Sequence, residues 1–281
     1  MKKSISQWAF PPETKLKECM TQAKKAGFEA IEVAITEKGE INLQSTREDM
    51  EKIVQEAKGE GLELSSLATG LFWDYSLSSN DSQVREKAKN IVKKMLELAS
   101  YLKVKTILVV PGAVNVPWNP ESEIVPYEAV YERVSNALKE AVKVAEEYKV
   151  NIGVENVWNM FLLSPLEMRN FIDEVKSEYV GVYFDVGNVL ISGFPEQWIR
   201  ILGNRIRAVH FKDFKRAIGN INGFVDLLEG DVNWPEVMKA FREIGYQGYV
   251  TAELFPPKFH SQHLIEKTSL AMDRILGRDD K

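Results

Sequence analysis

Residues 150–186 read VNIGVENVWNMFLLSPLEMRNFIDEVKSEYVGVYFDV and outline one unit of a parallel α/β fold. Residues 150–156 and 180–186 are short apolar runs, which are typical of buried strands. Between them, Ser164 occupies a predicted helix cap, Pro165 the first helical position and Glu167 the third position after the serine. A strand followed by a helix and another strand predicts two parallel strands joined by a crossover helix.

This alternation occurs eight times along the chain of 281 residues. Two further helix starts are predicted where Ser45 is followed by Glu48 and where Asn233 precedes a Trp-Pro-Glu sequence. Helices are predicted to end at Gly61 and Gly245, directly before the next strand. The eight predicted strands are residues 4–10, 28–35, 62–69, 104–111, 150–156, 180–186, 206–211 and 246–254.

The number of repeats favours a closed barrel over an open sheet. Eight parallel strands close around a core filled by side chains, and the mean repeat of about 35 residues suits such a barrel. The first strand-to-helix turn lacks the G-x-G-x-x-G sequence of an open dinucleotide-binding sheet. No Gly/Ser linker or change in composition divides the chain. We therefore predict an α/β fold, a single (β/α)8 TIM barrel domain over residues 1–281.

Composition excludes several other classes of protein. The 36 Lys and Arg residues form no block and the net charge is −5, so a nucleic-acid partner is not expected. No run approaches the ~20 apolar residues of a membrane span, and the first residues contain no apolar leader segment. The single cysteine, Cys19, excludes an intrachain disulfide and is predicted to be inert packing. These features predict a cytoplasmic protein without a membrane or nucleic-acid partner.

Barrel enzymes carry their reactive groups at the carboxyl ends of the strands. In this chain the last four predicted strands each end on an acid or an imidazole, namely Glu155, Asp185, His210 and Glu253. Each stands among apolar neighbours, where converging carboxylates are costly to desolvate and repel one another. A divalent cation would relieve both costs. Three carboxylates and one imidazole favour Mn²⁺, with Mg²⁺ and Co²⁺ as alternatives and Zn²⁺ as a less natural fit.

Other polar residues near the strand ends are expected to have structural roles. Glu32, Asp213 and Asp226 are each interpreted as members of structural ion pairs. His260 and His263 lie in a polar stretch at the start of the last predicted helix and are expected to be solvated. They are therefore not counted among the metal ligands.

Aromatic residues near the same ends, Trp8 and Trp118 among them, are candidates to wall a substrate. Capping of the barrel is an equally open role for each of them. Lys212 is a candidate for charge stabilisation or phosphate contact, with a solvated role equally open. The other aromatic candidates are Phe10, Phe72, Trp73 and Trp158.

Residues 153–156 (GVEN), 184–188 (FDVGN), 209–213 (VHFKD) and 251–253 (TAE) resemble the xylose-isomerase-like superfamily of divalent-metal barrels. Within it they are most similar to the L-ribulose or L-xylulose 5-phosphate 3-epimerases and the ketose 3-epimerases. The resemblance implies that Glu155 and Glu253 act as an acid/base pair as well as metal ligands, with Asp185 and His210 completing the metal shell. It also implies that Arg216 contacts a hydroxyl or carbonyl of the substrate.

The departures from the family pattern are also informative. Asn188 stands where free-sugar epimerases of the tagatose type usually carry a histidine, and Phe161 where they carry a glutamate. Both residues make the chain more similar to the 5-phosphate 3-epimerases, and Asn188 is predicted to contact the substrate. Leu228 replaces a glycine usual in the loop before the last helix start. The shape of that loop is left open by the sequence.

The predicted activity follows from the acidity of the hydrogen beside a ketose carbonyl. A cation chelated by the carbonyl and the neighbouring hydroxyl would stabilise the enediolate formed on deprotonation. Inversion of C3 requires one base on each face of the sugar, and Glu155 and Glu253 are the predicted pair. Residues 219–223 are a candidate phosphate-binding loop, because barrel phosphate sites often use the loops after strands seven and eight. We predict a metal-dependent 3-epimerase of a ketose or ketose phosphate.

Other activities remain alternatives. An aldose–ketose isomerase would use the same metal site, and an inosose-type dehydratase would eliminate water. A multi-zinc nuclease is disfavoured because the chain has only three histidines. A barrel that serves as a binding protein would hold no divalent metal. The sequence leaves open which sugar is used, whether it is phosphorylated, which metal is bound and whether the protein is a homo-oligomer.

Overall fold

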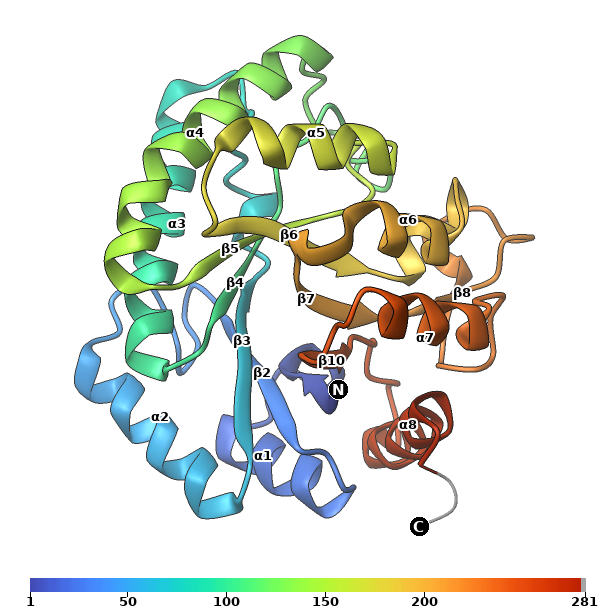
Figure 1. Cartoon of the computed structure of the whole chain (residues 1–281). Coiled ribbons are helices and arrows are strands. Elements are labelled where there is room, and N and C mark those ends of the chain that lie inside the picture. Colours follow the sequence, from blue (N-terminus) through green and yellow to red (C-terminus); the bar gives the residue numbers. More distant parts are fainter. Residues whose placement is uncertain (279–281) are drawn as a thin grey trace.

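The computed structural model describes residues 1–278, and its eight parallel strands close into a barrel in the order β1-β10-β7-β6-β5-β4-β3-β2 (Figure 1). The ring closes where Lys2 of β1 pairs with Tyr249 of β10. The predicted (β/α)8 TIM barrel is therefore confirmed. The barrel strands are β1 (Lys2–Ser6), β2 (Ala30–Ile35), β3 (Glu63–Thr69), β4 (Thr106–Val109), β5 (Asn151–Glu155), β6 (Val180–Asp185), β7 (Ile206–Phe211) and β10 (Tyr249–Ala252).

Eight α-helices surround this barrel in the described chain (Figure 1). Their apolar faces pack against the strands, as they must for a sheet that is buried on its outer side. Within residues 1–278 no helix is long and apolar enough to cross a membrane. The helices are α1 (Leu16–Lys25), α2 (Arg47–Glu60), α3 (Ser82–Leu102), α4 (Tyr127–Tyr148), α5 (Pro165–Val175), α6 (Pro195–Leu202), α7 (Trp234–Glu243) and α8 (Ser261–Leu276).

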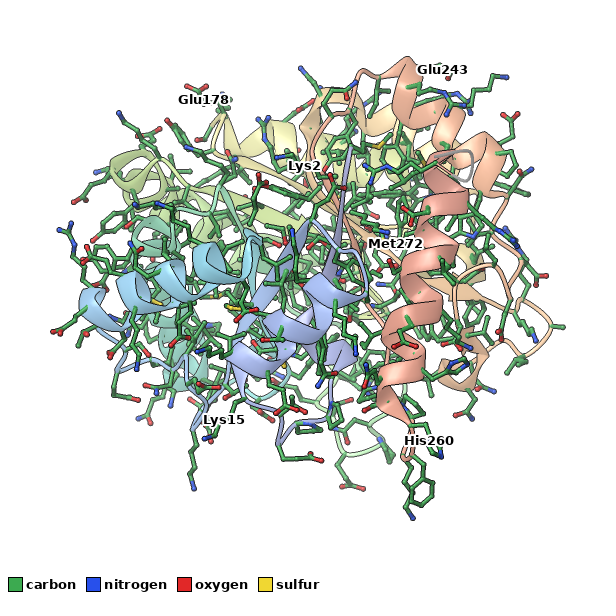
Figure 2. All side chains as sticks on the ribbon, turned by 90° about the horizontal axis from the view of Figure 1, so that it is seen from below. Lys2, Lys15, Glu178, Glu243, His260 and Met272 are labelled. Carbon is green, nitrogen blue, oxygen red and sulfur yellow. The ribbon has the colours of Figure 1, made fainter. Side chains whose placement is uncertain are left out.

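The two ends of the barrel are distinguished by the loops they carry. Glu178 and Glu243, which precede strands, lie with Lys2 at one end of the molecule (Figure 2). Lys15 and His260, which cap helices that follow strands, lie at the opposite end. That second end carries the carboxyl termini of all eight barrel strands, where a barrel enzyme places its site.

Helix starts agree with the predicted capping residues in two of the three places. Ser164 and Asn233 each accept a hydrogen bond from the backbone three residues later, at α5 and α7. The prediction of a cap at Ser45 is wrong by one residue, because α2 begins after Thr46. The hydroxyl of Thr46 accepts from the Asp49 amide, and the Asp49 carboxylate accepts from the Thr46 amide, which satisfies two amide donors at once.

Strand boundaries differ from the prediction mainly at the first and last strands. The predicted strand 4–10 is wrong at its end: β1 stops at Ser6, whose hydroxyl accepts from the Trp8 amide and starts a 3-10 turn, η1 (Gln7–Ala9). The last strand is shorter than predicted and ends at Ala252, one residue before Glu253. A hairpin of β8 (Asp213–Phe214) and β9 (Phe224–Val225) was not predicted, because two-residue strands have no readable period.

Candidate metal centre and substrate cavity

The structure brings together all four residues that were predicted as metal ligands. Glu155 and Asp185 are the last residues of β5 and β6, His210 is the penultimate residue of β7, and Glu253 follows β10. These four strands are consecutive neighbours in the barrel, and Asp185 pairs in register with His210. One ligand atom from each residue lies within 4.8 Å of all the others.

Three atoms of this cluster are buried without a hydrogen-bond partner among residues 1–278: Asp185 Oδ2, His210 Nδ1 and Glu253 Oε2. His210 Nδ1 lies 2.6 Å from Glu253 Oε2, but the two groups are not aligned for a hydrogen bond. It also lies 3.8 Å from Glu155 Oε1 and 3.9 Å from Asp185 Oδ2. Buried polar atoms are almost always paired, so several unpaired atoms that face one another fit a divalent cation.

Lys212 introduces a positive charge beside the cluster. Its Nζ lies 2.8 Å from Glu253 Oε2 and 3.2 Å from Asp185 Oδ2, and the side chain is buried. Burial lowers the pKa of the Lys212 ammonium, but the carboxylates of Asp185, Glu253 and Glu155 raise it further, so that the net shift is upward. Lys212 is therefore a buried cation beside the cluster, which contradicts the solvated alternative, while charge stabilisation or phosphate contact stays a prediction.

The carboxyl groups of the cluster have different electrostatic surroundings. Burial raises the pKa of Glu155 to about 7, against the opposing effects of His210 and Lys212. Burial also raises the pKa of Glu253, but Lys212 and His210 outweigh it and lower this pKa to about 2. Two carboxyl groups whose surroundings separate their pKa values are suited to opposite proton-transfer roles.

His210 is held from its other nitrogen by Glu32. His210 Nε2 lies 3.0 Å from Glu32 Oε1, and both side chains are fully buried inside the barrel. Glu32 Oε2 also accepts from the Ser66 hydroxyl at 2.8 Å and from the Tyr183 hydroxyl. A carboxylate on one imidazole nitrogen fixes the ring orientation and leaves the other nitrogen free to bind a metal. The ion-pair role predicted for Glu32 thus has a specific partner, His210.

Asp185 is held by two asparagines. Asn156 Oδ1 accepts from the Asp185 amide and Asn156 Nδ2 donates to the Asp185 carbonyl, both at 2.8 Å. The backbone amide of Asn188 donates to Asp185 Oδ1 at 2.7 Å, which leaves Oδ2 without a hydrogen bond and 3.2 Å from Lys212 Nζ. The sequence places Asn156 directly after Glu155 but contains no signal for this positioning role.

A cavity of about 540 Å³ opens above the cluster. Its floor contains Glu155, Glu253 and Lys212, so the candidate metal centre faces the cavity directly. Of the predicted substrate contacts, Trp8, Trp118, Asn188 and Lys212 line it. The aromatic wall is completed by Phe10, Trp73, Trp158, Phe224 and Phe255.

Arg216, the remaining predicted substrate contact, does not line this cavity. Its guanidinium lies over the Phe194 ring, 4.9 Å from the ring centroid, and donates to the Gly193 carbonyl at 2.6 Å. Phe72, a predicted rim aromatic, is buried in the core instead. A role for Arg216 with substrate therefore stays a prediction.

The loop that contains Leu228 keeps a conformation suited to glycine. Leu228 has a φ of 73°, and its amide donates to Asp213 Oδ2 at 3.0 Å. The same carboxylate accepts from the Val232 amide and the Trp234 indole. The ion pair predicted for Asp213 is not found within residues 1–278, because its carboxylate instead accepts these hydrogen bonds at the centre of the loop. Asp226 pairs with Lys267 as predicted.

Several known proteins are similar to this chain. The family model described as xylose isomerase-like TIM barrel matches residues 20–274. The putative L-ribulose-5-phosphate 3-epimerase SgbU of Escherichia coli K12 is 26% identical over 260 residues, which cover 90% of this chain and 88% of that protein. A solved structure of D-psicose 3-epimerase in the presence of D-fructose has a TM-score of 0.81 at 20% identity, covering 99% of this chain and 100% of the other. The IOLI protein with a zinc atom has a TM-score of 0.79 at 20% identity, covering 99% of each chain. At these identities the solved structures establish a shared fold.

Proposed function

The chain belongs to the xylose isomerase-like TIM barrel family, and from that premise we propose that it is a metal-dependent sugar epimerase that inverts C3 of a ketose or ketose phosphate. The observation that carries the proposal is the cluster of Glu155, Asp185, His210 and Glu253, of which the two glutamates line a cavity large enough for a sugar. The relative named as an L-ribulose-5-phosphate 3-epimerase supports the same reaction class. We also propose a cytoplasmic location.

The donor set supports a divalent cation as the cofactor. Glu155, Asp185, His210 and Glu253 would hold it, and their oxygen-rich chemistry favours Mn²⁺ over Zn²⁺. The zinc atom named for the IOLI protein, a structural neighbour, supports a divalent ion as the proposed cofactor. When bound, the cation supplies Lewis-acid stabilisation of negative charge on the sugar oxygens.

Proton transfer is assigned to the two glutamates. Glu155 ends β5 and Glu253 follows β10, so the two carboxyl groups reach the cavity from strands separated by β6 and β7. Inversion needs one group to take the C3 proton and another to return a proton to the opposite face. Lys212, fixed between Asp185 and Glu253, adds positive charge beside the sugar.

Exchange of the C3 hydrogen with solvent deuterium tests this proposal. We expect the Mn²⁺-loaded protein to exchange this hydrogen in at least one sugar of a panel of ketoses and ketose phosphates, followed by NMR. Glu155→Gln and Glu253→Gln should each abolish exchange, whereas Glu48→Gln, on the exposed face of α2, should retain it. Full exchange by either site variant would refute the two-base assignment. Formation of an aldose or of an enone would instead identify the isomerase or the dehydratase reaction.

A further inference from the structure

A second cavity of about 560 Å³ adjoins the first. Its wall comes from the loops that follow β4, β5, β6 and β7, at the same end of the barrel as the metal centre. The two cavities share five lining residues, Trp118, Val157, Trp158, Asn188 and Ile221. The two cavities therefore adjoin at these residues.

The second cavity is uncharged. Among residues 1–278, none of those that line it is a Lys, Arg, Asp or Glu. In the first cavity Lys212 is the one lining cation of the described chain, and Asp185 and Glu253 already hold it. Arg216 lines neither cavity. Residues 219–222 of the predicted phosphate-binding loop line the second cavity, but they bring no cationic side chain to it. Phosphate is bound most strongly by charged donors, so this lining favours a neutral substituent.

Two polar groups in the second cavity are free to bind a ligand. Trp198 is 5% exposed, and its indole Nε1 donates no hydrogen bond within residues 1–278. Asn188 uses its amide nitrogen on the Asn156 carbonyl, while its Oδ1 accepts no hydrogen bond in that part of the chain. A sugar ring has hydroxyl groups and apolar C–H faces. The second cavity offers a donor from Trp198, an acceptor from Asn188 and apolar walls such as Phe161 and Val189, which suit such a ring.

We infer that the substrate is a neutral ketose that carries a glycosyl substituent, and that the second cavity binds this substituent. The inference rests on the proposed function, because the reacting ketose occupies the first cavity. Epimerisation at C3 needs an open carbonyl at C2 and a hydrogen on C3. The glycosidic bond must therefore join a hydroxyl remote from both, such as the one on C6.

The first experiment compares three substrates of the Mn²⁺-loaded protein: fructose, 6-O-α-glucosylfructose and fructose 6-phosphate. The rate of C3 hydrogen exchange in D₂O is measured by NMR over a range of concentrations. We expect kcat/KM for the glucosylated ketose to be at least about ten times that for fructose, because one or two buried contacts of the glucosyl group suffice for a tenfold gain. The phosphate should be the poorest of the three. A glucosylated ketose no better than fructose, or a phosphate better than both, would overturn the inference.

Variants in the second cavity give an independent test. Ser192 lines this cavity and not the first, so the larger side chain in Ser192→Trp should fill the second cavity. The readout is kcat/KM for glucosylfructose divided by kcat/KM for fructose, and Ser192→Trp should lower this ratio about tenfold or more. Ser192→Ala, the matched control without added bulk, should keep the wild-type ratio. Trp198→Phe, which removes the indole N–H and retains a ring, should lower the ratio several-fold. An unchanged ratio in Ser192→Trp would contradict the placement of the substituent.

Binding measurements separate this inference from the proposed function. Titration calorimetry reports the binding of 6-O-α-glucosylfructose whether or not the sugar reacts, and comparison with Ser192→Trp reports the contribution of the second cavity. One outcome is that the wild-type protein binds this sugar more tightly than fructose, that Ser192→Trp removes the difference, and that no sugar exchanges its C3 hydrogen. The proposed epimerase activity then fails, while the second-cavity assignment stands. If fructose exchanges its C3 hydrogen and glucosylfructose shows no advantage in binding or rate, the inference fails while the activity stands.

Discussion

Replacement of Glu32 by glutamine tests how the metal centre is assembled. Glu32 does not line the cavity at the metal centre, yet its carboxylate lies 3.0 Å from His210 Nε2 and accepts from the hydroxyls of Ser66 and Tyr183. Glutamine has nearly the same shape but no charge, and only one of its two terminal atoms is an acceptor. If its amide nitrogen faces His210, the imidazole proton moves to Nδ1, the nitrogen that faces the other three ligands.

The magnitude follows from the hydrogen bond that is lost. Removal of the group that accepts a hydrogen bond from a metal-binding histidine typically lowers metal affinity or activity about 10- to 100-fold. At about 1.4 kcal/mol for each factor of ten, Glu32→Gln should weaken Mn²⁺ binding by about 1.4 to 2.8 kcal/mol. This range agrees with the ~1.5–3 kcal/mol assigned to a hydrogen bond to a charged group.

The assay is calorimetric titration of the metal-free protein with Mn²⁺, with circular dichroism to show that the variant is folded. Glu48→Gln removes an exposed carboxylate on α2 and should bind Mn²⁺ with the wild-type Kd. If Glu32→Gln does not fold, Tyr183→Phe removes a single donor to Glu32 and should weaken binding less, by about 3- to 10-fold. A folded Glu32→Gln variant whose Kd lies within twofold of the wild-type value would refute the positioning role.

Three further predictions concern stability and reactivity. Leu228→Gly should raise the free energy of unfolding by about 1 kcal/mol in urea denaturation, because a leucine at a φ of 73° is strained; destabilisation would contradict this. Gly187→Ala should lower the free energy of unfolding by about 1–3 kcal/mol and slow exchange of the C3 hydrogen, because the added Cβ would lie 2.5 Å from the Lys212 Cβ. Its control is Gly59→Ala on α2, where the added Cβ meets nothing within 4 Å, so that this variant should be neutral or stabilising. Burial, with smaller effects of Glu18 and Glu40, raises the pKa of Cys19 to about 12, so little of this cysteine is thiolate at pH 8. The protein should therefore react with a disulfide reagent at pH 8 only when it unfolds. Rapid modification of the folded protein would count against this prediction.

Periodic and local signals were sufficient to predict the barrel and its four candidate ligands. Eight repeats of strand and helix require parallel pairing, and parallel pairing places every strand's carboxyl end on one face. Glu155, Asp185, His210 and Glu253 could therefore be grouped before any contact between them was known. Such signals depend on spacing along the chain, which the sequence contains in full. The exceptions, such as the end of β1, lie where a turn interrupts the periodicity.

Contacts between distant residues were decided only by the tertiary structure. Glu32 and His210 are separated by 178 positions and meet inside the barrel because β2 and β7 both direct side chains to its interior. Lys212 reaches the metal centre whereas Arg216, four residues later, stacks on Phe194 outside it. The hairpin of β8 and β9 and the second cavity likewise depend on how separate loops pack. Spacing along the chain determines which face a residue occupies, but only the packing of loops and side chains determines which residues it contacts.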